Sequence, residues 1–372
     1  MNSTPLPPKS KRNPSIDLLK ILSFFLVVCV HFCTHSGFMT EPHMGFTMYV
    51  MNVAYAFSNT CVALFIMMTG FLMTNKRLSK SYYKGIIRVV IMYILCCDVC
   101  LIYKVVKYDY ALSFYEWTKR ILDFSASDYG WYFEMYLGLF ILIPFLNLAY
   151  HGLDTRKKKL VLLATMIALT ALPGVLNIFN FELGGWWAQP SLSREYMKLI
   201  PNFWAGFYPV TFYFIGCYLR EYPPKLKKRY IAAIWLISGI LWASFNFYRF
   251  YGGTFFWGSF AVNASLFNVI TATAFFALIS AMDLRAAPGP VKKVMAYTAK
   301  CTFSAYLLSA IVDMSVNSRF KALIPDLSEQ YRCAPVVVLI TFTISLILSA
   351  VLNGVYDLVA HLGKKAFARL QK

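Results

Sequence analysis

The chain has 372 residues, of which 59% are hydrophobic, 17% aromatic and only 14% charged. Soluble domains average about 25% charged residues, and a soluble chain of this composition would have to hide an implausible amount of apolar surface. The 36 Lys and Arg against 17 Asp and Glu give a net charge of +19. In a soluble protein that excess would suggest a nucleic-acid partner, so the positions of the basic residues have to decide between nucleic-acid binding and a basic membrane protein.

Ten apolar stretches run along the chain, each near the ~20 residues that a helix needs to cross ~30 Å of hydrocarbon. They predict an all-α, polytopic integral membrane protein with about ten transmembrane helices. The stretches cover residues 17–37, 47–74, 89–106, 131–150, 160–178, 203–219, 230–248, 258–282, 301–317 and 335–358. The first has no small-residue cleavage site and carries charged side chains, so we expect a retained span and not a signal peptide. Charges interrupt the third, and we expect 107–130 to be an external loop with an interfacial helix.

The basic residues fall mainly on alternate connecting segments. If the N-terminus is cytoplasmic and the spans alternate, 25 of the 36 Lys and Arg lie on cytoplasmic segments and ten on external ones. This bias predicts that both termini are cytoplasmic, in agreement with an even number of spans, and it argues against nucleic-acid binding. We expect a basic cytoplasmic tail over 1–14, one transmembrane domain over 15–358 and a second cytoplasmic tail over 359–372.

Ionisable side chains inside a membrane span cost several kcal/mol and are functional candidates. The first span holds four of them: Asp17, Lys20, His31 and His35. Lys20 and His31 are eleven residues apart, which places them on one helix face about 16 Å from each other along the axis. Asp17 and His35 extend this polar stripe by a turn at each end.

Other interpretations of these residues stay open. A single membrane His often only satisfies a hydrogen bond to a neighbouring helix, although a stripe of four polar groups makes that interpretation weaker. His31 and His35 also have the spacing of a metal pair, but no further ligands are evident, so no metal site is predicted. Asp98 and Asp313 are expected to be ion-pair partners that hold the helices together. For Glu134 a structural and a functional role are equally expected.

Five segments resemble the motifs of the membrane acyltransferase-3 family, bacterial enzymes that O-acetylate cell-envelope carbohydrates. Asp17-Leu-Leu-Lys20, ten intervening residues and His31 look like the family's Arg/Lys-x10-His signature. The other segments, in the family's order, are Leu64-Phe65-Ile66-Met67-Met68-Thr69-Gly70-Phe71-Leu72, Trp131-Tyr132-Phe133 with Leu137, Leu142 and Pro144, Phe214-Ile215-Gly216-Cys217-Tyr218-Leu219-Arg220, and Thr302-Phe303-Ser304-Ala305-Tyr306-Leu307-Leu308. The likeness covers most of the chain.

The sequence departs from the family pattern at three positions. Thr69 replaces the usual Ser, Tyr129 stands where many members have a His before the Trp, and Ser309 replaces a late His. The two absent histidines are therefore not essential here unless another residue substitutes for them.

The resemblance implies transfer of an acyl group, usually acetyl, from cytoplasmic acetyl-CoA to a carbohydrate hydroxyl at the bacterial inner membrane. Acetyl-CoA would be a donor substrate, with no cofactor bound permanently. CoA carries several phosphates, which a basic cluster can bind, and we expect Lys20, Lys84 and Arg88 to form that cluster. For Lys84 and Arg88, ordinary positive-inside anchoring is an equal alternative. His31 is expected to act as general base or transient acyl carrier.

The remaining candidates are supporting ones. Glu134 is expected to orient His31 or to bind the acceptor sugar, and Asp17 to pair with Lys20 or a neighbouring span. Trp131 and Tyr132 suit a stacking surface for the acceptor. The alternative is that they are ordinary aromatic anchors at the membrane interface. Thr69 and Gly70 are expected to give structural support.

Only the short segment 359–372 follows the last predicted span, so we expect direct transfer to the acceptor and no extracytoplasmic partner domain. The expected partners are the lipid bilayer, the acyl-CoA and an envelope carbohydrate. A secondary transporter with a buried charged path is the rival from another class, although no inverted repeat is visible. A different donor such as succinyl-CoA is a further alternative. The acceptor glycan and the oligomeric state are left open by the sequence.

Overall fold

The computed structural model describes residues 12–109 and 111–370, and every regular element in this part of the chain is a helix. Residues 1–11 of the predicted N-terminal tail and residues 371–372 of the C-terminal tail lie outside the described residues. The helices of the first half are α1 (Pro14–His35), α2 (Gly45–Ser58), α3 (Cys61–Met73), α4 (Lys80–Lys84), α5 (Ile87–Tyr108), α6 (Phe114–Leu122) and α7 (Trp131–His151). Those of the second half are α8 (Arg156–Thr170), α9 (Pro173–Leu176), α10 (Tyr208–Glu221), α11 (Lys228–Phe250), α12 (Leu266–Ser280), α13 (Gly289–Leu323) and α14 (Leu327–Leu370). Three short 3-10 turns lie at Gly37–Met39, Pro190–Leu192 and Phe203–Phe207.

Six helical segments of the described chain are long and apolar enough to cross a membrane. They are Pro14–His35, Gly45–Met73, Lys80–Tyr108, Trp131–His151, Lys228–Phe250 and Leu327–Gly363. The other four predicted spans also fall on helices, but α8, α10 and α12 have only 15, 14 and 15 residues. With a rise of about 1.5 Å for each residue, these three helices are shorter than the hydrocarbon core. The fourth, α13, is long enough but carries more polar residues. The all-α prediction is confirmed, and six of the ten predicted spans have the length and composition of a membrane-crossing helix.

Helices α1 and α13, which carry His31 and Asp313, run side by side in the same direction. Near their N-terminal ends, Arg12 donates a hydrogen bond of 2.7 Å to the carbonyl of Ala296. Near their C-terminal ends, His31 Nδ1 lies 3.7 Å from an oxygen of Asp313. The number of residues between these two contacts is nearly the same on both helices, so α1 and α13 run parallel over about 25 Å. A charged group near one end of α1 therefore has neighbours on the same level of α13.

Helices α3 and α10 approach each other unusually closely. A Cβ added to Gly70 would lie 2.0 Å from the carbonyl oxygen of Tyr213, and one added to Gly216 would lie 2.1 Å from that of Met67. Small residues allow such backbone contact between membrane helices. Gly70, expected to give structural support, is thus one of two glycines that allow α3 and α10 to pack so closely.

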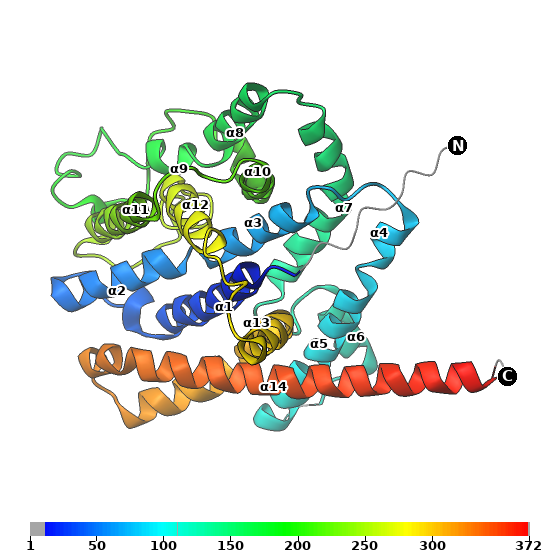
Figure 1. Ribbon diagram of the computed structural model, residues 1–372. Helices are drawn as coiled ribbons and strands as arrows, with labels where there is room; N and C mark the ends of the chain where they lie inside the picture. The colour runs from blue at the N-terminus through cyan, green and yellow to red at the C-terminus, as the bar shows by residue number, and fades with distance from the viewer. Residues whose placement is uncertain (1–11, 110, 371–372) are drawn as a thin grey trace.

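The C-terminal helix α14 is the longest element and extends past the other helices at its C-terminal end (Figure 1). Its Asp357 accepts hydrogen bonds from Arg88 of α5 and from Lys300 of α13. Deeper in the bundle, Ser349 and Asn353 bind Ser304 of α13. These polar contacts hold three helices together at the end of the bundle where α1 begins.

The segment after α5 contains the separate short helix that we expected between the third and fourth spans. Helix α6 begins with a capping box, in which Ser113 and Glu116 satisfy each other's backbone N–H groups. It buries none of its residues, and Phe114 and Leu122 are 88% and 71% exposed. Trp117 donates a hydrogen bond of 2.9 Å to Asp98 of α5, so this intramembrane carboxylate is held by an indole and not by the ion pair that we expected.

Candidate active site

His31 lies in the last two turns of α1, among residues from two other parts of the chain. Its imidazole stacks on the ring of Tyr129, with centroids 3.6 Å apart and planes at 23°. Its Nδ1 is buried, has no hydrogen-bond partner among the described residues, and lies 3.7 Å from Asp313 Oδ2. This distance is too long for a hydrogen bond but within ion-pair range. The carboxylate favours a proton on Nδ1 and so leaves the lone pair on Nε2.

Asp313 belongs to a hydrogen-bonded chain that passes around His31. The Tyr129 hydroxyl donates to Asp313 Oδ2 at 2.8 Å, and His35 Nε2 lies 3.0 Å from the same hydroxyl. A hydroxyl has one proton, and Asp313 receives it, so His35 must supply the proton of the second bond. Asn317 completes the chain by donating to the carbonyl and the side chain of Asp313. The carboxylate, only 1% exposed, is thereby fixed beside the imidazole.

A cavity of about 330 Å³ leads from the N-terminal half of α1 towards this cluster. Lys20 and Lys300 line it, as do Thr69 of α3, Tyr132 of α7 and Val27 of α1. Most of the other lining side chains are apolar. Val27 precedes His31 by one helical turn on the same face of α1, so the cavity begins at two cations and ends one turn before the imidazole.

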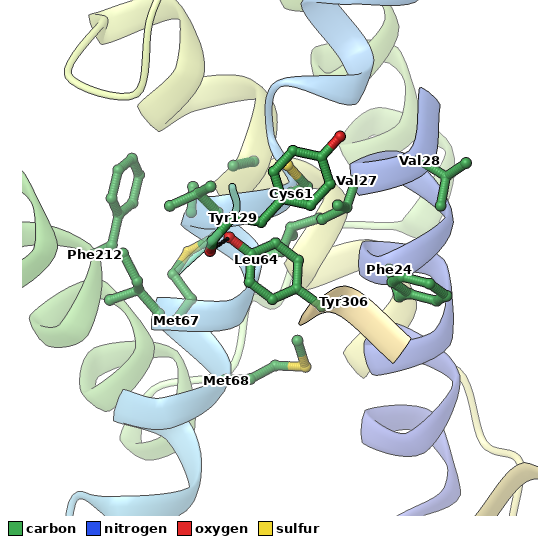
Figure 2. Close-up of a cluster of buried hydrophobic side chains, with 14 of the residues drawn as sticks. Phe24, Val27, Val28, Cys61, Leu64, Met67, Met68, Tyr129, Phe212 and Tyr306 are labelled. Carbon is green, nitrogen blue, oxygen red and sulfur yellow. Dashed lines mark hydrogen bonds between the residues drawn. The ribbon is translucent and has the colours of Figure 1, made fainter. Parts of the chain in front are cut away.

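Two tyrosines separate the end of the cavity from His31. Figure 2 shows Tyr129 and Tyr306 between α1, which carries Phe24 and Val27, and α3, which carries Leu64. The Tyr306 hydroxyl donates a hydrogen bond of 2.5 Å to the carbonyl of Tyr129. Tyr306 lines the cavity, whereas Tyr129 stacks on His31, so this pair of rings connects the two regions.

The expected donor-binding residues do not form one cluster. Lys20 lines the cavity, but neither Lys84 nor Arg88 does. Both are exposed, and Arg88 is paired with Asp357 at 3.2 Å. The second cation of the cavity is Lys300 of α13, which was not among the expected donor-binding residues. Lys20 and His31 do lie along one face of α1, as their spacing predicts.

Asp17 pairs with neither Lys20 nor a neighbouring span. It accepts two hydrogen bonds from Arg12, of 2.7 and 3.0 Å, just before α1 begins. The expectation failed because Arg12 is close in the sequence and folds back over the first turn. Asp17 therefore stabilises the start of the helix through its ion pair with Arg12.

Glu134 lies in the first turn of α7 and is exposed, and its carboxylate has no hydrogen-bond or salt-bridge partner within 12–109 and 111–370. The carboxylate beside His31 is that of Asp313, which is on another helix. Trp131 is 42% exposed, as a surface residue should be. Tyr132 instead faces the cavity and contacts Tyr306 edge-on, with centroids 5.6 Å apart. The two neighbouring aromatic residues thus lie in different surroundings.

Sequence reasoning missed Asp313, Tyr129 and Lys300 as members of this site. Asp313 was noticed as an acidic residue inside a span, and Tyr129 as a departure from the family pattern. Their positions gave a signal, but their common partner His31 belongs to the first helix and is remote from both in the sequence. Within the part of the chain that the structure describes, no group of three His, Cys, Asp or Glu side chains is placed to hold a metal ion.

The comparisons with known proteins identify the family. No curated protein and no solved structure matches the chain. The family model described as an acyltransferase domain matches residues 13–354, which include every helix from α1 through most of α14. The match covers most of the 372 residues, and it includes His31, Tyr129 and Asp313. The chain is a membrane protein of the acyltransferase-3 family.

Proposed function

We propose that the protein transfers an acetyl group from cytoplasmic acetyl-CoA to a hydroxyl of a cell-envelope carbohydrate at the bacterial inner membrane. The observation that carries the proposal is the cavity that begins at Lys20 and Lys300 and ends one turn before His31. An uncharged pantetheine arm suits its apolar wall, and Lys20, which takes part in no salt bridge among the described residues, suits the phosphates that follow the arm. The distance of about 16 Å between Lys20 and His31 along the helix axis is of the same order as the length of that arm.

The geometry around His31 suits general base catalysis. With a proton on Nδ1 facing Asp313, Nε2 takes the proton of the acceptor hydroxyl as the oxygen attacks the thioester carbonyl. The carbon–sulfur bond then breaks, and the imidazolium returns the proton to the departing CoA thiolate. Asp313 stabilises the imidazolium, and Tyr129 and Asn317 hold Asp313 in place. A transient acyl-imidazole would use the same nitrogen as nucleophile.

The proposed topology has ten membrane passes and both termini in the cytoplasm. The parallel course of α1 and α13 supports it, because the first and ninth spans of a ten-span protein cross in the same direction. The contact between Asp357, Arg88 and Lys300 supports it too, since all three lie on segments or helix ends assigned to the cytoplasmic side. In this arrangement Lys20 is near the cytoplasm and His31 nearer the outside.

The test is acetyl transfer by the purified protein in lipid nanodiscs, with radiolabelled acetyl-CoA and envelope carbohydrate as acceptor. His31→Ala is expected to abolish transfer, while His361→Ala, a histidine on the exposed surface of α14, leaves it unchanged. Full transfer by His31→Ala would refute the assignment. Preference for succinyl-CoA in a competition assay would change the donor, and solute uptake by liposomes without CoA would identify a transporter.

A further inference from the structure

A second and larger cavity, of about 1580 Å³, adjoins the first. Its wall is formed by the connection between α3 and α4, by the start of α5 and by the second half of α7. Met73, Val89 and Tyr136 line both cavities, so the two spaces are neighbours with a shared wall. A ligand that fills the narrow cavity can therefore continue into the wide one.

The wide cavity is suited to negatively charged ligands. Lys76 and Arg77 lie in its wall together with the polar side chains of Asn75, Ser79 and Ser81. None of its lining residues is Asp or Glu, and neither cation takes part in a salt bridge among the described residues. In contrast, Arg88 and Lys300 are both paired with Asp357. Lys76 and Arg77 are thus available for a phosphate.

Helix α7 holds this basic segment in a defined conformation. Asn147 donates hydrogen bonds of 2.8 Å to the carbonyls of Met73 and Lys76, and His151 donates one of 2.8 Å to the carbonyl of Thr74. Tyr213 of α10 donates to Asn147 Oδ1 at 2.6 Å and so orients the amide. Three neighbouring anchor points turn a surface loop into a preorganised wall, which reduces the entropy that binding has to overcome.

We propose that the wide cavity binds the phosphorylated nucleotide end of the acyl-CoA donor, with Lys76 and Arg77 as its phosphate ligands. This inference rests on the proposed function, because it takes the donor from there. A lipid headgroup in the cytoplasmic leaflet would offer the same phosphate chemistry. The nucleotide is favoured since one CoA molecule has both an uncharged arm for the narrow cavity and a charged end for the wide one.

The probe for this site is adenosine 3′,5′-bisphosphate, which contains the nucleotide end without the arm. Its binding to the full-length protein in nanodiscs is measured by calorimetry. The double variant Lys76→Ala, Arg77→Ala is expected to bind it about tenfold more weakly, since two charge-assisted contacts are lost. Lys80→Ala is the matched control, because Lys80 is a nearby exposed lysine that does not line either cavity. Equal affinity of the double variant and the wild type would overturn the proposal.

The lipid source is tested in the same experiment. Nanodiscs of phosphatidylcholine alone and nanodiscs with one third phosphatidylglycerol are compared for bisphosphate binding. If the nucleotide occupies the cavity, affinity is similar in both, apart from a uniform surface-charge effect that Lys80→Ala shares. If anionic lipid blocks bisphosphate binding to the wild type but not to the double variant, the cavity is a lipid site and the proposal is wrong.

The outcome also separates this inference from the proposed function. Bisphosphate binding that depends on Lys76 and Arg77, in a protein without acetyl transfer, would keep the nucleotide site and remove the transferase chemistry. If the protein transfers acetyl groups and the KM for acetyl-CoA is the same in the double variant and the wild type, the transferase chemistry stands and the nucleotide site is refuted. A tenfold higher KM in the double variant, with kcat unchanged, would support both.

Discussion

At the scale of single residues, the contact between His31 and Asp313 is the centre of the site. An imidazole that acts as a base needs a fixed tautomer, and a carboxylate at its second nitrogen provides one. Here that carboxylate is itself held by Tyr129 and Asn317, and its Oδ2 lies 3.7 Å from His31 Nδ1. Such contacts often tighten only when the reacting groups are bound.

Asp313→Asn is expected to lower kcat of acetyl transfer about 100-fold, because the amide cannot stabilise the imidazolium that forms during the reaction. The KM for acetyl-CoA should stay the same, since the donor site lies on the other side of the tyrosine pair. Asp98→Asn is the control, as it removes another intramembrane carboxylate, one that Trp117 holds on α5. An unchanged kcat in Asp313→Asn would show that the carboxylate is only structural.

Tyr129→Phe tests the role of the Tyr129 hydroxyl separately from the role of its ring. The ring still stacks on His31, but Asp313 and His35 lose their common hydrogen-bond partner. We expect kcat to fall about tenfold, which corresponds to the loss of the hydrogen bond that positions Asp313. Steady-state kinetics of the two proteins side by side provide the measurement, and wild-type kcat in the variant would contradict a positioning role for the hydroxyl.

Sequence alone could predict that His31 and Lys20 share a helix face, but it could not predict their neighbours on other helices. The spacing of eleven residues fixes a common helix face whatever the rest of the fold does. Asp313 becomes a neighbour of His31 only through the packing of α1 on α13, and Lys300 enters the cavity for the same reason. The prediction of Glu134 as an orienting group failed here, because a polar residue in a span does not reveal which helix it faces.

At the scale of helices, the crossing of α3 and α10 depends on two glycines. Gly70→Ala would place a methyl group 2.0 Å from the Tyr213 carbonyl, and the helices would have to separate. We expect a loss of about 1–3 kcal/mol in stability, as for other overpacked sites, seen as a lower melting temperature in detergent.

Gly138→Ala is the matched control for this prediction. Gly138 is also a glycine within a membrane helix, but nothing lies within 4 Å of a Cβ added there. The substitution should leave the melting temperature unchanged or raise it slightly, because alanine favours the helix. Equal effects of Gly70→Ala and Gly138→Ala would mean that the contact between α3 and α10 is not close in solution.

The helices themselves were predictable because hydropathy is a local property. Each of the ten apolar stretches contains a helix, and the amphipathic α6 was expected between the third and fourth. The lengths of α8, α10 and α12 could not be predicted from hydropathy. Their ends are set by turns and irregular segments such as 177–207, which pack against other parts of the chain. Apolar composition alone cannot distinguish a spanning helix from a short one buried among its neighbours.

At the scale of the whole molecule, the proposed topology predicts which loops face the cytoplasm. The cysteine substitutions Ser79→Cys and Pro223→Cys should be protected from a membrane-impermeant maleimide in intact cells, whereas Glu182→Cys and Trp257→Cys should react. Cys333 is half-buried in the second turn of α14, on the side that the topology assigns to the outside, so all four substitutions are made in a Cys333→Ser background. The reverse labelling pattern would show that the topology is inverted, with the Lys20 end of the cavity on the outside.

The tyrosine pair between the first cavity and His31 has a consequence for the cell's energy supply. Val27 and Tyr306 line this end of the cavity, and neither of them is charged. On the proposed function, the protein has to move an acyl group past Tyr306 and Tyr129 without becoming a leak for protons. Uncharged surroundings of this kind favour a neutral thioester over hydrated ions, so the membrane can keep its electrochemical gradient during each turnover.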